Sequence, residues 1–391
     1  MMDKKEWLKK TAKLALTGAI LTTMMVSPAF AAEDGGSVSE GVISTATANQ
    51  VKKITLQEAM DQALENNSTV ITAANAWEKA KVEKKQADSQ AENMWRALGK
   101  PSENQMDQNQ YAIMILTPQL KGMAVEMAEY SNDLAIAATK LQVINQYFTI
   151  ASCGKTENSL LDAYEKAQRQ YNTVKSKYSV GMASKLEVTT AQLEIDSAKI
   201  ALENARNNTI QSKRALCVTM GLDANAQISP STPLTYEKLN ITDKDKAVQE
   251  LVEKNPQVKI DKVNYEMAKV QYDYDIGVNT NFTYNGQIAQ KTFDSAKVQY
   301  ETTLRETEAN AYKTIENLLL AEKQYNMALE SKELYQEVYR LAELRYENGL
   351  ATQNDVLDAA ADLTNADSQI ISALLQFNVA KTAMDQGIIS E

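Results

Sequence analysis

A seven-residue spacing of apolar residues is the main pattern of this chain. Near the C-terminus, large residues recur at every seventh position, and alanines follow three places behind them. The large row is Val356, Leu363, Ile370, Phe377 and Met384, and the small row is Ala359, Ala366, Ala373 and Ala380. Paired rows of this kind are typical of the a/d seam of a coiled coil, so we expect a long helix packed along a second helix.

The same seam occurs 168 residues earlier in the chain. Its large row is Val188, Ile195, Leu202, Thr209 and Leu216, and its small row is Ala191, Ala198, Ala205 and Ser212. A Tyr-x-x-Gly motif precedes each seam, at Tyr178–Gly181 and at Tyr346–Gly349. A shared seam behind a shared motif indicates an internal duplication.

A long helical pattern leads into each Tyr-x-x-Gly motif, over about residues 122–178 and 295–346. The first would span ~85 Å at 1.5 Å per residue, which a compact domain cannot hold, so it needs a partner along its length. Gly181 and Gly349 would then be the tips of antiparallel hairpins. The predicted fold is therefore mainly α: two duplicated long antiparallel coiled-coil helical hairpins, with few or short β-strands.

One stretch predicts a strand. Alternate positions are apolar or β-branched over about ten residues, namely Ile276, Val278, Thr280, Phe282 and Tyr284. This period of two and length suit a tilted strand of a membrane barrel, and Asn285–Gly286 favours a hairpin turn after it. The expected return strand, 287–294, lacks this alternation. A second apolar run, 111–116, is consistent with either a strand or a buried helical turn.

The remaining segments divide the chain into five parts. Lysines, then an apolar run from Leu14 to Val26, then Ala29-Phe-Ala31 are typical of a secretory signal peptide. We therefore expect a signal peptide over 1–31, a disordered leader over 32–53, a first repeat over 54–225, a linker over 226–242 and a second repeat over 243–391. After residue 31 no run reaches the ~18 apolar residues of a membrane-spanning helix.

Composition excludes several functions. The formal charge of −10 disfavours nucleic-acid binding, since no basic stripe would offset phosphate repulsion. The chain has no histidine and two isolated cysteines, Cys153 and Cys217, which rules out the usual zinc constellations and catalytic triads. We therefore expect no cofactor, no metal and no enzyme.

The chain resembles the outer-membrane efflux proteins, the TolC-like family. The resemblance is carried by four motifs: Leu56-Gln-Glu-Ala-Met, Asn255-Pro256, the two Tyr-x-x-Gly breaks, and Asp355-Val-Leu-Asp358-Ala. It implies a homotrimer whose hairpins form an α-barrel tunnel, with the β-barrel strands reduced in this chain. It also implies partners: a periplasmic adaptor, an inner-membrane pump and the outer membrane.

The resemblance also suggests functional residues. Asp355, Asp358 and Glu187 match acidic positions at the tunnel entrance, where a threefold axis would gather carboxylates into a ring that binds cations. The alternative is that acids in a first helical turn complement the helix dipole. Tyr178, Gly181, Tyr346 and Gly349 would form the tips where the adaptor docks, or the glycines are simply turn residues.

Two functions remain open on the sequence. The first is a passive export duct, the channel-tunnel component of a tripartite efflux or type I secretion system. The second is a periplasmic or cell-surface coiled-coil scaffold that has lost the membrane barrel.

Overall fold

The computed structural model describes residues 51–99, 101–241, 243–279 and 282–389. The predicted signal peptide, 1–31, and nearly all of the predicted leader lie outside the described residues. The end of that leader is nevertheless ordered, because Lys52–Ile54 forms strand β1. This strand pairs in parallel with β2 (Ile228–Pro230), in the predicted linker.

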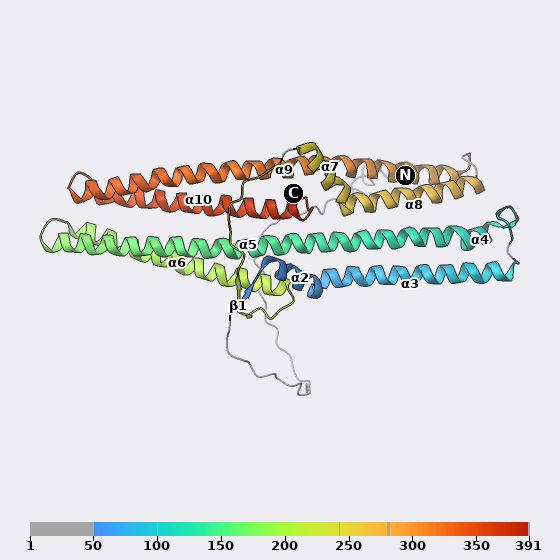
Figure 1. The fold of residues 1–391 in the computed structure, drawn as a ribbon, viewed down its shortest axis with the longest axis horizontal. Coiled ribbons are helices and arrows are strands. Elements are labelled where there is room, and N and C mark those ends of the chain that lie inside the picture. The colour runs from blue at the N-terminus through green and yellow to red at the C-terminus, as the bar shows by residue number, and fades with distance from the viewer. Residues whose placement is uncertain (1–50, 100, 242, 280–281, 390–391) are drawn as a thin grey trace, which may run out of the picture. The chain divides into compact units, whose positions relative to one another are not determined.

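The described residues are helical over most of their length (Figure 1). The first repeat contains α2 (Leu56–Asn66), α3 (Ser68–Ala97), α5 (Thr117–Ser179) and α6 (Lys185–Thr219). The second contains α7 (Lys244–Lys254), α8 (Pro256–Asn279), α9 (Tyr284–Glu347) and α10 (Gln353–Asp385). Three short helical turns precede α5: η1 (Glu103–Gln105), α4 (Gln108–Tyr111) and η2 (Ala112–Leu116). The predicted fold class is confirmed.

Each repeat is built on one very long helix. Helix α5 has 63 residues and α9 has 64, so each runs about 95 Å. Helix α3 packs along the first half of α5 and α6 along its second half, while α8 and α10 pack in the same way on α9. Helix α5 also contacts α8 and α10, which joins the two repeats (Figure 1). We call α5–α6 the first hairpin and α9–α10 the second.

The helices begin where the sequence places a cap. Thr55 Oγ1 accepts the backbone N–H of Glu58 at 3.2 Å, and Thr55 N–H donates to Glu58 Oε2 at 2.8 Å. This capping box satisfies two backbone donors that a helix start otherwise leaves unpaired.

Within the described residues, no helix combines the length and the apolar character that crossing a bilayer requires.

A buried tyrosine ties the predicted linker to the first repeat. The hydroxyl of Tyr147 donates to the carbonyl of Ile54 at 2.8 Å and accepts the N–H groups of Ser231 (3.0 Å) and Thr232 (2.8 Å). Further along, Tyr236 donates to Glu322 Oε1 at 2.9 Å. The segment 226–241 is therefore a packed strap between α5 and α9.

The strand predicted over 276–284 is wrong for the part of that stretch that the structure describes; Thr280 lies outside the described residues. Helix α8 continues to Asn279, and α9 begins at Tyr284 after Thr283 Oγ1 accepts the N–H of Gly286 at 3.1 Å. The dipeptide Asn285–Gly286 thus lies in the first turn of a capped helix. A single strand would have no neighbouring strand to pair with, because residues 287–294 lack the alternation of a return strand. Packing of α8 along α9 therefore decides the conformation of this segment.

The apolar run 111–116 is a helical turn. Tyr111 ends α4, and Ala112–Leu116 forms the π-helix η2, directly before Pro118 in the first turn of α5. A proline inside a regular helix clashes with the carbonyl four residues earlier, and a π-turn relieves such a clash by widening the backbone. The chain can therefore run through Pro118 without a break.

Candidate functional site

The two hairpin tips have the same backbone conformation. After α5, Gly181 has φ 77°, its N–H donates to Tyr178 O at 3.0 Å, and Met182 N–H donates to Lys177 O at 2.8 Å. After α9, Gly349 has φ 72° and repeats both bonds at 3.1 and 2.8 Å. This is the Schellman motif, which needs a left-handed residue. A Cβ at either glycine would meet no atom within 4 Å, so the dihedral alone requires glycine.

The predicted gate acids cap the helices that leave these tips. Asp355 Oδ2 accepts the N–H of Thr352 at 2.7 Å and its hydroxyl at 2.8 Å. Glu187 Oε2 accepts the N–H of Ser184 at 2.5 Å. The backbone bond first, and the side-chain bond second, lower the pKa of each carboxyl. Asp358 lies one turn further along α10 and is exposed.

The two motif tyrosines occupy different environments. Tyr178 is 46% exposed, whereas Tyr346 is 7% exposed. The Lys177 ammonium lies 3.7 Å from the centre of the Tyr346 ring and donates to the Tyr346 carbonyl at 3.3 Å. Burial first, and then the negative charge of Glu187, raise the pKa of the Tyr346 phenol. The first hairpin therefore covers the tyrosine of the second.

A small core joins the tips. It consists of one buried residue from each of the four helices, namely Val174, Ala191, Tyr346 and Val356. The structure thus brings Glu187 and Tyr346 into one neighbourhood, whereas the ring of Tyr178 is exposed. In this conformation the ring of Tyr178 is available to a partner protein and the ring of Tyr346 is not.

The sequence analysis missed one residue of this site. Gln353 is buried, and neither its side-chain oxygen nor its nitrogen has a hydrogen-bond partner among the described residues; the same holds for the Tyr346 hydroxyl. The equivalent position in the first repeat is Lys185, which is exposed. In the sequence, the charged Lys185 at one tip and the uncharged Gln353 at the equivalent position of the other indicated that the two tips differ.

A row of large apolar residues lies exposed on α9. Its members recur every seven residues and are 42–64% exposed: Leu320, Met327, Leu334 and Leu341. On the equivalent face of α5, Ser159 donates to Asp367 at 3.5 Å and the Lys166 ammonium lies 5.3 Å from the Tyr339 ring centre. This face of α5 therefore contacts the second hairpin, whereas the same face of α9 is uncovered. We call the four residues the α9 stripe.

The chain therefore consists of two similar helical hairpins. Their tips pack together in one small core, and the α9 stripe remains exposed on the second hairpin. The sequence profile described as "Outer membrane efflux protein" matches residues 122–222 and 254–387. The chain belongs to the outer membrane efflux protein family.

Individual relatives are distant. The chain is 21% identical over 293 residues to TtgC of Pseudomonas putida, described as a probable efflux pump outer membrane protein. That match covers 64% of this chain and 59% of TtgC, so the chain spans little more than half of that relative.

Solved structures share the fold at low identity. A membrane protein from Pseudomonas aeruginosa superposes with a TM-score of 0.71 at 15% identity, over 85% of this chain and 93% of that one. The outer membrane protein VceC of Vibrio cholerae gives 0.68 at 14% identity, over 85% and 95%.

Proposed function

We propose that the chain is one subunit of a homotrimeric export duct, a passive channel-tunnel in the periplasm and outer membrane that performs no chemistry of its own. The observation that carries this proposal is the α9 stripe. Because the equivalent face of α5 contacts the second hairpin within the chain, the stripe on α9 would contact the first hairpin of the next copy. Contacts of this head-to-tail kind close into a ring when the rotation between neighbouring copies closes.

The first hairpin offers a matching surface. Helix α6 exposes Leu186, Leu193 and Ile200, again seven residues apart. Two apolar rows with this period can interdigitate as knobs into holes, and α6 and α9 run in opposite directions along the hairpins. The pairing would remove both rows from water.

The tips would face the other components of a tripartite efflux or type I secretion system. Tyr178 and Gly181 of one chain and Gly349 of the next would form the surface on which a periplasmic adaptor docks, with an inner-membrane pump behind it. Tyr346 would support that surface from inside the tip core.

A threefold axis would bring Asp355, Asp358 and Glu187 of three chains toward one lumen and form a cation-binding ring. Crowded carboxylates resist joint ionisation, so assembly would raise the pKa of Asp355 and Glu187 against the lowering by their caps. The cap role and the ring role are compatible, since a cap uses one carboxylate oxygen.

The alternative is a coiled-coil scaffold that conducts nothing. It is favoured by the helical conformation of residues predicted as a strand, at the end of the hairpins where a barrel was expected. Both functions predict the ring, so conduction separates them.

Two measurements test the duct. Leu193→Cys combined with Leu334→Cys should give disulfide-linked trimers on denaturing gels, while either single variant gives none. In planar bilayers, Asp355→Ala with Asp358→Ala should alter conductance and weaken block by divalent cations. Unlinked chains would refute the ring, unchanged currents would refute the gate, and a linked trimer without currents would favour the scaffold.

A further inference from the structure

A cavity of about 430 Å³ lies between the short turns that precede α5 and the last turns of α8. These elements are at the end of the helices opposite the hairpin tips (Figure 1). The residues that line the cavity fall within 106–119 in the first repeat and within 270–277 in the second. Small-molecule sites in proteins usually have volumes of roughly 300–1,000 Å³, so this cavity is large enough for a small organic molecule.

Two stacked tyrosine rings form one wall of the cavity. The rings of Tyr111 and Tyr274 have their centres 5.6 Å apart and their planes inclined by 12°. The Tyr274 hydroxyl donates to the carbonyl of Gln108 at 3.2 Å, which fixes the orientation of its ring. Met106 and Leu116 add apolar surface to the lining. The wall therefore offers aromatic rings and a thioether, which are groups that bind apolar and polarisable ligands.

The charged residues of the lining are two acids, Asp107 and Asp273, and the lining contains no Lys or Arg. Asp107 Oδ1 accepts the N–H of Gln110 at 2.9 Å as the N-cap of α4, so its second oxygen is left for another contact. Asp273 makes no hydrogen bond or ion pair within the described residues, not even with Lys269 one turn earlier on α8. The cavity therefore has two carboxylates that no cation of the chain neutralises.

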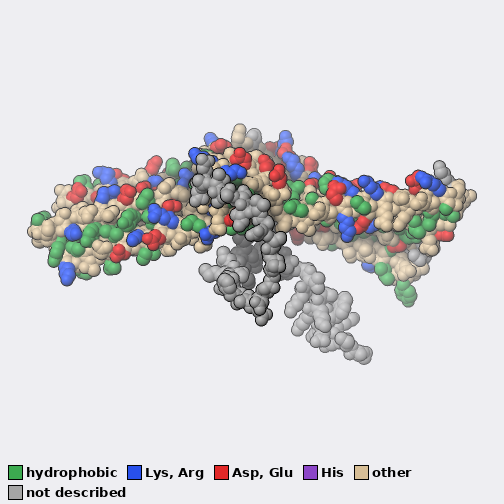
Figure 2. All heavy atoms as spheres, turned by 90° about the horizontal axis from the view of Figure 1, so that it is seen from below, with side chains coloured by type: hydrophobic (Ala, Val, Ile, Leu, Met, Phe, Trp, Pro, Cys, Tyr) green, Lys and Arg blue, Asp and Glu red, His purple; other side chains and the backbone are tan. Residues whose placement is uncertain are grey.

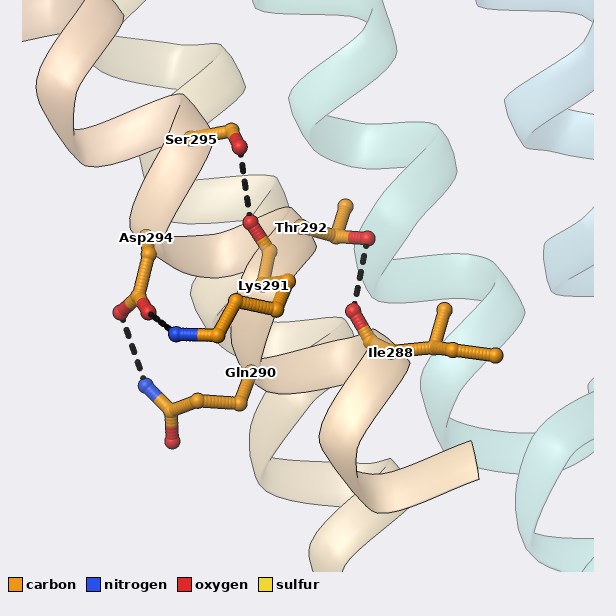
Figure 3. Close-up of polar contacts among 6 residues, drawn as sticks. All are labelled: Ile288, Gln290, Lys291, Thr292, Asp294 and Ser295. Atoms are coloured by element: carbon orange, nitrogen blue, oxygen red, sulfur yellow. Dashed lines mark hydrogen bonds and ion pairs between the residues drawn. The ribbon is translucent and has the colours of Figure 1, made fainter. Parts of the chain in front are cut away.

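Elsewhere on the molecule, acids are commonly paired with lysine or arginine. Acidic and basic side chains are interspersed along the helices on the face shown in Figure 2. Asp294 on α9 pairs with Lys291 at 3.0 Å and accepts Gln290 Nε2 at 2.9 Å (Figure 3). The hydrogen bond from Gln290 first, and then the contact with Lys291, lower the pKa of the Asp294 carboxyl. By contrast, the last turn of α8 beside the cavity contains no basic residue, so the negative end of the helix dipole adds to the charge of the two carboxylates.

We propose that this cavity binds a small organic cation, namely a quaternary or protonated amine joined to an apolar body. Tyrosine rings attract a cation that lies within about 6 Å of the ring centre, and Asp107 and Asp273 would neutralise its charge. The apolar body would contact Met106 and Leu116. A metal ion fits less well, because it needs several oxygen ligands and no cluster of three metal-ligating side chains occurs in the described part of the chain. The proposal goes beyond the duct, since one chain forms the whole site.

Isothermal titration calorimetry of the exported chain with benzyltrimethylammonium tests the proposal. We expect one probe to bind per chain, and benzyl alcohol, which has the ring without the charge, to bind at least tenfold more weakly. The variant Asp107→Asn, Asp273→Asn should lose at least tenfold in affinity for the probe, while asparagine keeps the N-cap of α4. The matched control is Asp133→Asn, Asp162→Asn, which removes two exposed carboxylates of α5 and should bind within twofold of the wild type. Circular dichroism confirms that the variants keep the fold.

A second pair of variants separates the space from the charge. Gly277 lines the cavity, and a Cβ at this position would meet no atom within 4 Å. Gly277→Leu therefore fills the space and leaves both acids in place, and we expect it to lose at least tenfold in affinity. Gly154→Leu also adds a side chain to a helical glycine with open space around it, and it should bind within twofold of the wild type.

Four outcomes would overturn the proposal: a wild type that does not bind the probe, equal loss in the two double aspartate variants, full binding by Gly277→Leu, or benzyl alcohol bound as tightly as the cation. Displacement of the probe by an equal concentration of Mg²⁺ would also overturn it, in favour of a metal site. A trimer that does not bind the probe would refute this site alone, and a monomer that binds it would refute the duct alone.

Discussion

The two hairpin tips have the same backbone conformation, but their tyrosines lie in different environments. Both end in a Schellman glycine, and both start the next helix with a capping box. Yet Tyr346 is buried beneath Lys177, while Tyr178 is exposed. The difference teaches that a duplicated motif determines local conformation, whereas burial depends on which hairpin lies beside it. In this chain the first hairpin covers Tyr346 of the second hairpin, while Tyr178 of the first remains exposed.

The largest expected effect is a difference in the free energy of unfolding between alanine variants of the two tyrosines. Tyr346→Ala should destabilise the dissociated chain by about 3 kcal/mol, because it opens a cavity in the tip core. Tyr178→Ala should cost less than about 0.5 kcal/mol, as surface substitutions usually do. Urea unfolding of the two variants measures both values. Equal losses would mean that the tips are equivalent in solution, against the asymmetry described above.

The glycines should behave alike. Gly181→Ala and Gly349→Ala should each cost about 1 kcal/mol, since each places a side chain at positive φ without a steric clash. Gly154→Ala is the matched control: that glycine lies inside α5 with open space around its Cβ, so alanine should stabilise by about 0.5–1 kcal/mol. Unequal costs at the two tips, in the same unfolding assay, would show that their backbones differ.

The smallest effect concerns the capping acids. Their folded pKa values are lowered, so the stabilisation is present above the ordinary carboxyl pKa of about 4 and is lost as pH falls through the lowered values. Asp355→Asn and Glu187→Gln should therefore each flatten the loss of stability on acidification below about pH 4. Asp358→Asn, which removes a carboxylate outside the cap, serves as the control. If Asp355→Asn and Glu187→Gln lose stability on acidification as the wild type does, the carboxylates do not stabilise the helix starts as caps.

The sequence was sufficient for features that depend on local residues. The seven-residue seams predicted the long helices, Thr55 and Glu58 predicted a capping box, and Gly181 and Gly349 predicted tips. Each follows from side-chain period, cap chemistry or backbone freedom, which neighbouring residues in the chain determine.

Features that depend on distant packing could not be predicted. The alternation at 276–284 resembled a strand, but α8 continues to Asn279 and packs along α9, which begins at Tyr284. The burial of Tyr346 and Gln353 required knowledge of the first hairpin beside them. The stacking of Tyr111 on Tyr274 joins two segments that lie far apart in the sequence, and no local pattern indicated it.

The central claim is that the uncovered edge of the second hairpin is closed by another copy. Sedimentation of the exported chain measures this most directly, compared with Met327→Glu, Leu334→Glu in the α9 stripe and with Leu329→Glu, which lies on a different face of the same helix. The account predicts a particle of three chain masses for the wild type and for Leu329→Glu, and a single chain for the stripe variant. A monomeric wild type, or a stripe variant that remains trimeric, would contradict it.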